Sequence, residues 1–355
     1  MSLNSALCSM NRSPFNTNIR SIIKKQEMMK RAAINGLGRI GRATLKIILE
    51  RNDMELVAVN DLVPVSNLVY LLKYDTVYGR YEKEVRETDD ALVIEGQEIK
   101  VFNEKDPAAL PWKDLDIEMV FECTGVFTTE EELKKHIRAG AGNVILSAPA
   151  KGDEIGTVVH GVNTEKGDDR IISCASCTTN CITPVVEVMN RRVGIEKAIM
   201  TTVHAYTSTQ SIVDSPAKKV RRGRAGAANL VPTSTGAAIA TGKALPEVQG
   251  KFNGVAIRCP VPVGSIADIV FVTSRDVTEE ELNDIFREEA SSDRYRGILG
   301  VAEDEFVSSD IIGDPRASVV DTDMTQVVQG NLVKIMSWYD NEWGYASQMV
   351  KEAAK

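Results

Sequence analysis

The most reactive side chains of the sequence lie in residues 173–181, SCASCTTNC, which hold three of its six cysteines. Cys174 and Cys177 have the spacing of a redox pair or of two metal ligands, and Cys181 could be a third ligand. One nucleophilic thiol with two inert neighbours fits the same segment. A metal cluster would also need a fourth ligand, and the remaining cysteines, none of them in a ligand-like pair, are Cys8, Cys123 and Cys259. We therefore expect no metal, while the spacing alone does not choose between a redox pair and a nucleophile.

A helix that begins at Cys177 would favour the nucleophile. Ser176 is a good N-cap residue, and Cys177 would then lie in the first turn, where free amides and the helix dipole stabilise a thiolate. Lowering a thiol pKa from about 8.5 to about 6 takes about 3.4 kcal/mol, of which a helix end supplies about 1 kcal/mol. A further partner such as an imidazolium is therefore expected.

Three histidines are available to be that partner. His136 lies in the charged segment EEELKKHIRAG and is expected on the surface, and His160 lies in the strand-like segment VVHGVN without a reactive neighbour. His204 ends the β-rich segment AIMTTVHAYT, and sites are often built where strands end. Either His204 pairs with Cys177 or it is an ordinary core histidine.

A second group of residues has the pattern of a dinucleotide-binding loop. Residues 35–41, NGLGRIG, match G-x-G-x-x-G through Gly36, Gly38 and Gly41. The first glycine allows a tight turn, the second lets the backbone approach a pyrophosphate, and the third lets helix and strand pack closely. Asp61 follows at about the 20-residue offset expected of a carboxylate that binds the ribose 2′-hydroxyl. Because that carboxylate would repel a 2′-phosphate, NAD is favoured over NADP.

The apolar pattern indicates which elements position these residues. Strands are predicted over residues 32–35, 56–60, 119–122 and 144–147, and they alternate with helices predicted over 40–50, from about 65, and over 130–139. This alternation is typical of an α/β domain with a parallel sheet. After residue 183 the connections lengthen, and strands are predicted over 199–204, 254–258, 266–273 and 332–339. The second part is therefore expected to be an α+β domain.

Length and composition agree with a two-domain enzyme. A chain of 355 residues exceeds the size at which single cores stop growing, about 250–300 residues. No run of about 18 apolar residues predicts a membrane span, and a net charge of −8 argues against general nucleic-acid binding. Six cysteines are too few for a disulfide scaffold, so the cytoplasm is the expected compartment.

Residues 1–30 are set apart by their charge, since they carry five basic residues and one acidic residue. They could be an organellar transit peptide, a disordered tail, or sequence upstream of a true start at Met28 or Met29.

From about Arg31 to its C-terminus the chain resembles phosphorylating glyceraldehyde-3-phosphate dehydrogenase. The segments that carry the resemblance are INGLGRIGR, SAPAK at 147–151, ASCTTNC, TTVHAYT, PTSTGAA at 232–238 and SWYDNEWGY at 337–345. The resemblance implies a cytoplasmic homotetramer of glycolysis and gluconeogenesis that oxidises D-glyceraldehyde 3-phosphate with NAD and inorganic phosphate. It also implies a Rossmann NAD-binding domain over 31–176, completed by a C-terminal helix over 341–355, a catalytic domain with a mixed sheet over 177–340, and an extension over 1–30.

The resemblance further assigns residues. Cys177 matches the nucleophile and His204 the base, which leaves Cys174 and Cys181 as small buried residues. Beside the three glycines, the matched cofactor positions are Arg39, Ile40, Asp61, Lys105, Ser147 and Asn341. The matched phosphate positions are Ser176, Thr178, Thr207, Arg222, Thr235, Gly236 and Arg258. Cys174 stands where the family usually has asparagine, so hydrogen bonding near the site can differ. Lys105 stands where arginine is common, which should matter little if only one donor is used.

Two alternatives remain open at this point. One is erythrose-4-phosphate dehydrogenase, which shares the cysteine and the histidine, although PTSTGAA resembles the glyceraldehyde enzyme more. The other is a non-catalytic thiol redox sensor or RNA-binding protein, against which the intact Cys177, His204 and paired phosphate positions argue. The basic run over residues 218–224 could be read as a nucleic-acid patch. We interpret that run as a subunit-interface loop from which only Arg222 reaches a phosphate, because the rest of the chain is acidic. No nucleic acid and no membrane is expected as a partner.

Overall fold

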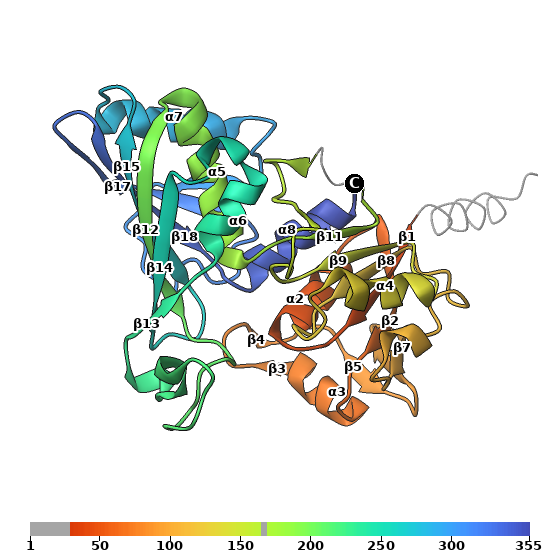
Figure 1. Ribbon diagram of the computed structural model, residues 1–355. Coiled ribbons are helices and arrows are strands. Elements are labelled where there is room, and N and C mark those ends of the chain that lie inside the picture. The colour runs from red at the N-terminus through yellow and green to blue at the C-terminus, as the bar shows by residue number, and fades with distance from the viewer. Residues whose placement is uncertain (1–28, 165–168) are drawn as a thin grey trace, which may run out of the picture.

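The computed structural model describes residues 29–164 and 169–355, and Figure 1 shows how they form two sheets with their helices. Of the extension expected over residues 1–30, only the last two residues fall within this part of the chain.

The first sheet has nine strands, and its central strands are parallel. Its order is β10 (Gly156–Thr157), β11 (Ile171–Ser173), β9 (Asn143–Leu146), β8 (Met119–Glu122), β1 (Lys30–Asn35), β2 (Met54–Asn60), β7 (Gln97–Phe102), β6 (Ala91–Ile94) and β5 (Val85–Glu87). Only β5, β6 and β7 pair antiparallel with one another. The carboxyl ends of the parallel strands thus meet at one edge, where open α/β sheets bind their ligands.

Helices cover both faces of this sheet, as a parallel sheet requires. The helices are α2 (Arg39–Ile48), α3 (Val65–Lys73), α4 (Glu130–Arg138) and α8 (Trp343–Ala353). Along β1, Ile34 packs with α2, α3 and α8, whereas Ala33 packs with Leu133 of α4 on the other face. The alternation of side chains along a strand accounts for these two separate cores.

The second sheet has seven strands and is mixed. Its order is β13 (Val231–Ser234), β14 (Phe252–Cys259), β12 (Ile195–Ala205), β15 (Ser265–Thr273), β18 (Leu332–Tyr339), β17 (Ser318–Val328) and β16 (Leu299–Ala302). The pairs β12/β14 and β16/β17 are parallel and the others antiparallel. The expected α/β class, with a second domain built on a mixed sheet, is confirmed.

Within residues 29–164 and 169–355, helices cover one face of the second sheet and not the other. The helices α5 (Cys177–Arg192), α6 (Ala237–Ala244) and α7 (Glu279–Ser291) bury Met200, Ile269 and Phe271. On the opposite face Ile199 is 62% exposed and Val255 is 51% exposed. Figure 1 shows α5 and α6 beside the strands, on the side nearer α8, and α7 across the top of the sheet.

Shorter elements complete the described chain. They are the β3 and β4 pair (Tyr74–Asp75 and Gly79–Arg80) and the 3₁₀ turns η1 (Pro107–Ala109), η3 (Val220–Gly223), η4 (Gly226–Ala228) and η5 (Pro246–Val248). The helices of this part of the chain include none that is both long enough and apolar enough to cross a bilayer.

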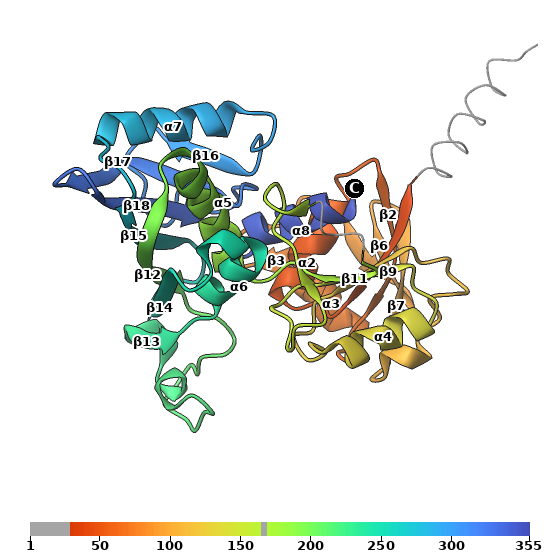
Figure 2. The ribbon, with the colours of Figure 1, turned by 45° about the horizontal axis from the view of Figure 1, so that its top comes forward.

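The two sheets are joined through α8, which lies between them in Figure 2. Tyr345 and Met349 of α8 belong to the core of the first sheet, and the Tyr345 hydroxyl donates to the carbonyl of Ala175, two residues before α5. Cys177 packs against the cores of both sheets. The start of α5 therefore lies where the two halves of the chain meet.

Candidate active site

Cys177 is the first residue of α5, as the sequence predicted. The Ser176 hydroxyl accepts from the Thr179 amide at 3.2 Å and caps the helix. Ala175 has φ +53°, a left-handed conformation that turns the chain sharply into the helix. The half-buried Cys177 thiol thus lies beside the free amides and the positive end of the dipole of a 16-residue helix.

The two neighbouring cysteines are buried, which confirms the prediction that they are small core residues. Cys174 is 4% exposed and Cys181 is not exposed. Burial raises the pKa of Cys174 well above its ordinary value and that of Cys181 to about 12. Both are therefore protonated and poorly reactive at neutral pH. The five cysteines that the structure describes are all free thiols, and the described residues form no group of acids, histidines and cysteines suited to a metal ion.

His204, near the end of β12, is brought directly to this thiol. Its Nε2 atom lies 3.4 Å from Cys177 Sγ, and its Nδ1 atom lies 2.7 Å from the carbonyl oxygen of Ala205. When Nδ1–H donates to that carbonyl, the lone pair of Nε2 faces the sulfur. This arrangement can accept the thiol proton without rearrangement.

The charge near the pair comes from an arginine. Nη1 of Arg258 donates to the Ala205 carbonyl oxygen at 2.9 Å. It also lies 2.7 Å from His204 Nδ1, which can accept from it only in the other tautomer, with the proton on Nε2; transfer of the thiol proton to Nε2 needs the form protonated on Nδ1. Burial and the Arg258 charge lower the pKa of His204 to about 3. Burial raises the pKa of Cys177, and the charge of Arg258 opposes part of this rise. The prediction that an imidazolium stabilises the thiolate is therefore wrong. With its pKa lowered, the His204 ring is neutral at pH 7, and the cation beside the thiol is Arg258.

A second arginine is held by hydroxyl groups. Arg222 donates from Nε to Thr233 Oγ1 and from Nη1 to Thr209 Oγ1, each at 3.2 Å, and Thr207 Oγ1 lies 2.9 Å from Thr209 Oγ1. Burial and the charge of the nearby Arg258 lower the pKa of Arg222. Two guanidinium groups lined by hydroxyls are well suited to bind phosphate. Thr209 and Thr233 were not predicted, although each lies two residues from a predicted threonine.

The remaining predicted phosphate positions differ in how open they are. Thr235 and Gly236 immediately precede α6, where Thr235 Oγ1 accepts from the Ala237 amide at 3.2 Å and an added Cβ on Gly236 would meet no atom within 4 Å. Thr178 is only 4% exposed, and its hydroxyl lies 2.9 Å from the Tyr339 hydroxyl. The Thr178 side chain is therefore buried and bonded within the core, and the sequence did not predict this.

A cavity of about 420 Å³ lies at the carboxyl ends of β1, β2 and β8. Its lining includes the predicted residues Gly36, Gly38, Asp61 and Lys105. An added Cβ on Gly38 would meet nothing within 4 Å, which leaves the backbone open to a ligand, and Gly36 needs its positive φ of 92° for the turn. Asp61 Oδ2 accepts from the amide of Leu37 at 2.6 Å. Loop, acid and helix start thus have the arrangement that binds a dinucleotide.

Three more predicted cofactor positions surround this loop. The Arg39 guanidinium is bound to Glu342, at 2.6 Å, and to Asp75, so only the backbone of Arg39 at the helix start remains for a phosphate. Ile40 packs against the core of the first sheet. An added Cβ on Gly41 would lie 1.9 Å from the carbonyl oxygen of Gly36, which is the close packing predicted for the third glycine.

The last two predicted cofactor residues follow strands. Ser147 comes directly after β9. Asn341 comes two residues after β18 and is 4% exposed, and its Oδ1 accepts from the Gly264 amide at 3.2 Å and from the Ser265 hydroxyl at 2.9 Å. These bonds fix the orientation of the carboxamide through its oxygen.

The two other histidines are not where the sequence placed them. His136 is completely buried, so its assignment to the surface is wrong; it lies three residues after Leu133 on the inner side of α4. His160 lies in a turn rather than a strand, and its Nδ1 is 2.6 Å from Glu352 Oε2. His136 Nε2 lies 3.1 Å from Glu122 Oε2, so each of the two histidines has an acidic partner that its local sequence does not reveal.

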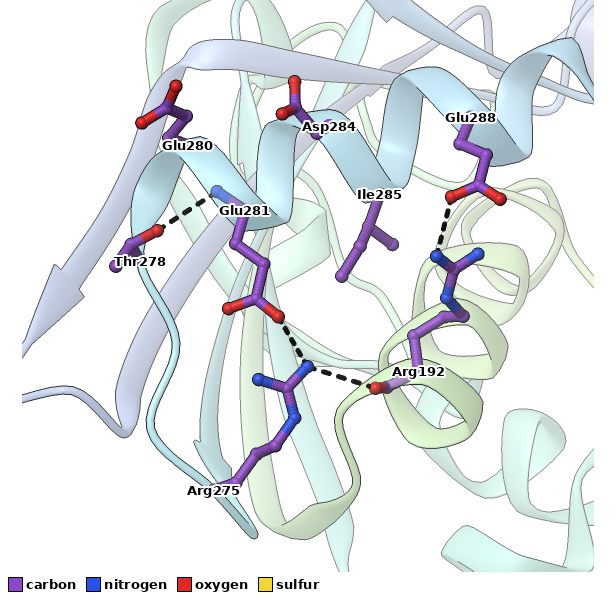
Figure 3. A pocket seen from close by; sticks show the side chains of 8 residues that line it. All are labelled: Arg192, Arg275, Thr278, Glu280, Glu281, Asp284, Ile285 and Glu288. Atoms are coloured by element: carbon purple, nitrogen blue, oxygen red, sulfur yellow. Dashed lines mark hydrogen bonds and ion pairs between the residues drawn. The ribbon is translucent and has the colours of Figure 1, made fainter.

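A larger cavity, about 490 Å³, lies far from the predicted residues, between α7 and the end of α5 (Figure 3). Most of its walls are charged side chains, among which Arg192 pairs with Glu288 and Arg275 with Glu281, each at 2.7 Å. The eight residues drawn there include none of those predicted for chemistry or binding. Size alone therefore does not identify the site.

Comparisons with known proteins agree with this arrangement. The family model for the NAD-binding domain of glyceraldehyde 3-phosphate dehydrogenase matches residues 30–130, and the model for its C-terminal domain matches residues 176–341. Glyceraldehyde-3-phosphate dehydrogenase of Streptomyces coelicolor is 48% identical over 91% of this chain and 97% of its own length. The enzymes of that name from Borreliella burgdorferi, with 49% identity, and Haloarcula vallismortis, with 46%, are similar over 91% of this chain and 98% and 97% of theirs.

Proposed function

The chain belongs to the glyceraldehyde-3-phosphate dehydrogenase family, and from this premise we propose that it oxidises D-glyceraldehyde 3-phosphate with NAD and inorganic phosphate to 1,3-bisphosphoglycerate. It is an NAD-dependent oxidoreductase of glycolysis. The observation that carries the proposed chemistry is the 3.4 Å separation of Cys177 Sγ and His204 Nε2 at the start of a helix.

In the proposed reaction Cys177 is the nucleophile and His204 the base. The thiol proton passes to Nε2 while Sγ bonds to the aldehyde carbon, and the new oxyanion is held by the Cys177 amide and by the protonated ring. The oxyanion takes the proton from His204, which accepts it again as the hydride leaves the carbon. NAD, when bound, supplies the hydride acceptor. Inorganic phosphate then attacks the thioester carbon, and the sulfur leaves as the thiol.

The cofactor would lie across the first sheet. The glycine loop and the start of α2 would hold the pyrophosphate, Asp61 the ribose and the Asn341 carboxamide the nicotinamide amide. Lys105 lines the same cavity and Ser147 follows the neighbouring strand β9. Gly38, whose missing side chain leaves the backbone open, supports this assignment.

The phosphate groups would be bound at the positively charged side of the second domain. Arg222 and Arg258 supply the guanidinium groups, and the hydroxyl of Thr207, the start of α6 at Thr235 and Gly236, and the cap residue Ser176 supply neutral donors. Thr178 contributes through its backbone, because its hydroxyl is bonded to Tyr339.

We also propose the division of the chain into an NAD-binding domain over 31–176, completed by 341–355, and a catalytic domain over 177–340. The packing of α8 into the core of the first sheet supports it.

A homotetramer is the assembly we propose. Its support is the uncovered face of the second sheet, with Ile199 and Val255, and the loop before β13, where Ile212 is 91% exposed and Leu230 69% exposed. Exposed apolar groups of this kind mark protein contacts. Static light scattering should give four subunits. The cytoplasm is the proposed location, in keeping with free thiols.

One assay separates this function from its alternatives. NAD reduction with glyceraldehyde 3-phosphate should require inorganic phosphate for sustained turnover. Phosphate-independent turnover would contradict the phosphorylating reaction, and a higher kcat/KM for erythrose 4-phosphate would instead identify the related dehydrogenase. No NAD reduction with either aldehyde would favour a thiol sensor. The names of the similar proteins do not favour these alternatives.

A further inference from the structure

A row of buried hydrogen bonds crosses the carboxyl ends of four adjacent strands beside the nucleotide cavity. Asn35 of β1 is in register with Glu122 of β8 and with Asn60 of β2. Asn35 Nδ2 donates to Glu122 Oε2 at 2.6 Å, and Asn60 Nδ2 donates to Asn35 Oδ1 at 2.7 Å. Asn60 also exchanges two hydrogen bonds with the backbone of Glu104, just after β7, at 2.8 and 2.9 Å. Asn35, Asn60 and Glu104 all line the cavity.

Glu122, at one end of this row, holds a second wall of the cavity. Its Oε1 atom accepts from the Thr124 amide at 2.8 Å and from the Thr124 hydroxyl. Thr124 lines the cavity and packs so closely on Gly36 that a Cβ there would lie 2.8 Å from the Thr124 nitrogen. One carboxylate therefore fixes both the residue before the glycine loop and the segment that packs on that loop.

His136 completes the set of donors around Glu122. The indole Nε1–H of Trp112 donates to His136 Nδ1 at 3.0 Å, so Nδ1 carries no proton. The proton must then be on Nε2, which lies 3.1 Å from Glu122 Oε2 and donates to it. Each oxygen of Glu122 thus accepts two hydrogen bonds, and Glu122 and His136 are both completely buried. Four donors, none of them a lysine or an arginine, thus satisfy the two carboxyl oxygens.

We propose that Glu122 is a positioning residue for the dinucleotide, which it serves by fixing Asn35 and Thr124 before the cofactor binds. The inference rests on the proposed function, since it takes the ligand of this cavity to be NAD. A wall that is already ordered lowers the cost of binding. Because Glu122 acts on the cavity rather than on the reacting carbon, its loss weakens NAD binding and leaves the chemical step unchanged.

The test replaces the carboxylate by its amide. In Glu122→Gln one oxygen becomes an NH₂ group that faces two donors, so two of the four hydrogen bonds are lost. We expect the Kd and the KM for NAD to rise about tenfold, with kcat at saturating NAD and the KM for the aldehyde changed less than about twofold. Isothermal titration calorimetry gives the Kd, and initial rates give the other constants.

Two controls separate positioning from stability. Glu187→Gln removes a similar buried acceptor, bonded to Arg191, Arg294 and Tyr295, from the other half of the chain. It should lower the melting temperature and leave the Kd for NAD unchanged. At His136, leucine removes the donor to Glu122, whereas glutamine can keep an N–H at the position of Nε2. His136→Leu should raise the Kd about threefold, and His136→Gln should restore it.

The measured Kd values for NAD either support the positioning role of Glu122 or overturn it. A wild-type Kd for NAD in folded Glu122→Gln, or equal rises in Glu122→Gln and Glu187→Gln, would overturn the proposal. If Glu122→Gln does not fold, the two His136 variants decide it, because equal values of the Kd in both would overturn it. Failure of the unaltered protein to bind NAD would instead contradict the cofactor assignment, so the two failures are distinguishable.

Discussion

His204 Nε2 lies 3.4 Å from Cys177 Sγ, although 27 positions of the chain separate the two residues. The thiol is placed by the start of α5 and the imidazole by the end of β12, two elements that share the core of the second sheet. Because both side chains are held by regular structure, the proton can move between them without a change of backbone.

The first prediction concerns the reactivity of the thiol. His204→Asn removes the proton acceptor, so alkylation of Cys177 by iodoacetamide at pH 7 should slow at least tenfold, and kcat should fall about 10²- to 10⁴-fold. The rate of alkylation is measured against pH in both proteins. An identical pH profile would show that the ring does not activate the thiol.

The second prediction concerns stability in acid. The pKa of His204 is about 3 in the folded protein and 6.5 ordinarily, so below pH 6.5 the unfolded chain binds a proton that the folded chain does not. This residue therefore lowers the free energy of unfolding progressively as the pH falls from 6.5 to about 3, by about 2 kcal/mol at pH 5.

Urea unfolding at pH 7.5 and pH 5 checks this effect. The wild-type protein should lose about 2 kcal/mol more than His204→Asn between the two values. Equal losses in the two proteins would mean that the buried ring can be protonated without cost.

The third prediction concerns the phosphate groups. Arg222→Leu should raise the KM of glyceraldehyde 3-phosphate or of inorganic phosphate about 10- to 100-fold, since hydrogen bonds to a charged group contribute about 1.5–3 kcal/mol. The matched control is Arg224→Leu in the same loop, where an exposed guanidinium pairs with Asp214 at 2.7 Å. Arg224→Leu should leave both KM values unchanged. Unchanged values in Arg222→Leu would remove Arg222 from the site.

The fourth prediction concerns the choice of cofactor. Asp61→Asn removes the charge that opposes a 2′-phosphate and keeps an oxygen for the Leu37 amide. The ratio of kcat/KM for NAD to that for NADP should fall at least about tenfold, which corresponds to about 1.4 kcal/mol. Initial rates with both cofactors measure it. A ratio equal to that of the unaltered protein would place the source of the preference elsewhere.

Local sequence signals predicted much of the fold and of the site. The cap residue Ser176 fixes where α5 begins, and the glycine spacing fixes the loop after β1, because each depends on a few neighbouring residues. The strand that ends near His204 was predicted from its own β-branched and apolar pattern.

What the sequence did not predict depends on distant partners. Arg39 is bound to Glu342, 303 positions away, and Thr178 to Tyr339, 161 positions away, so neither side chain is free as the motifs suggested. His136 was assigned to the surface because of its charged neighbours, although its spacing from the buried Leu133 was a signal for the inner side of the helix. The sequence predicted Arg258 only as a phosphate-binding residue. Its position on β14, with its charge close enough to lower the pKa of Cys177, depends on the pairing of β14 with β12.

The most direct test of the account is mass spectrometry of the protein after reaction with glyceraldehyde 3-phosphate and NAD in the absence of inorganic phosphate. The peptide that contains Cys177 should carry one 3-phosphoglyceryl group as a thioester, which added phosphate removes. Cys177→Ser should show no such adduct, lose at least about 10³-fold in activity and still bind NAD. An acyl group on another residue, or sustained turnover by Cys177→Ser, would contradict the account.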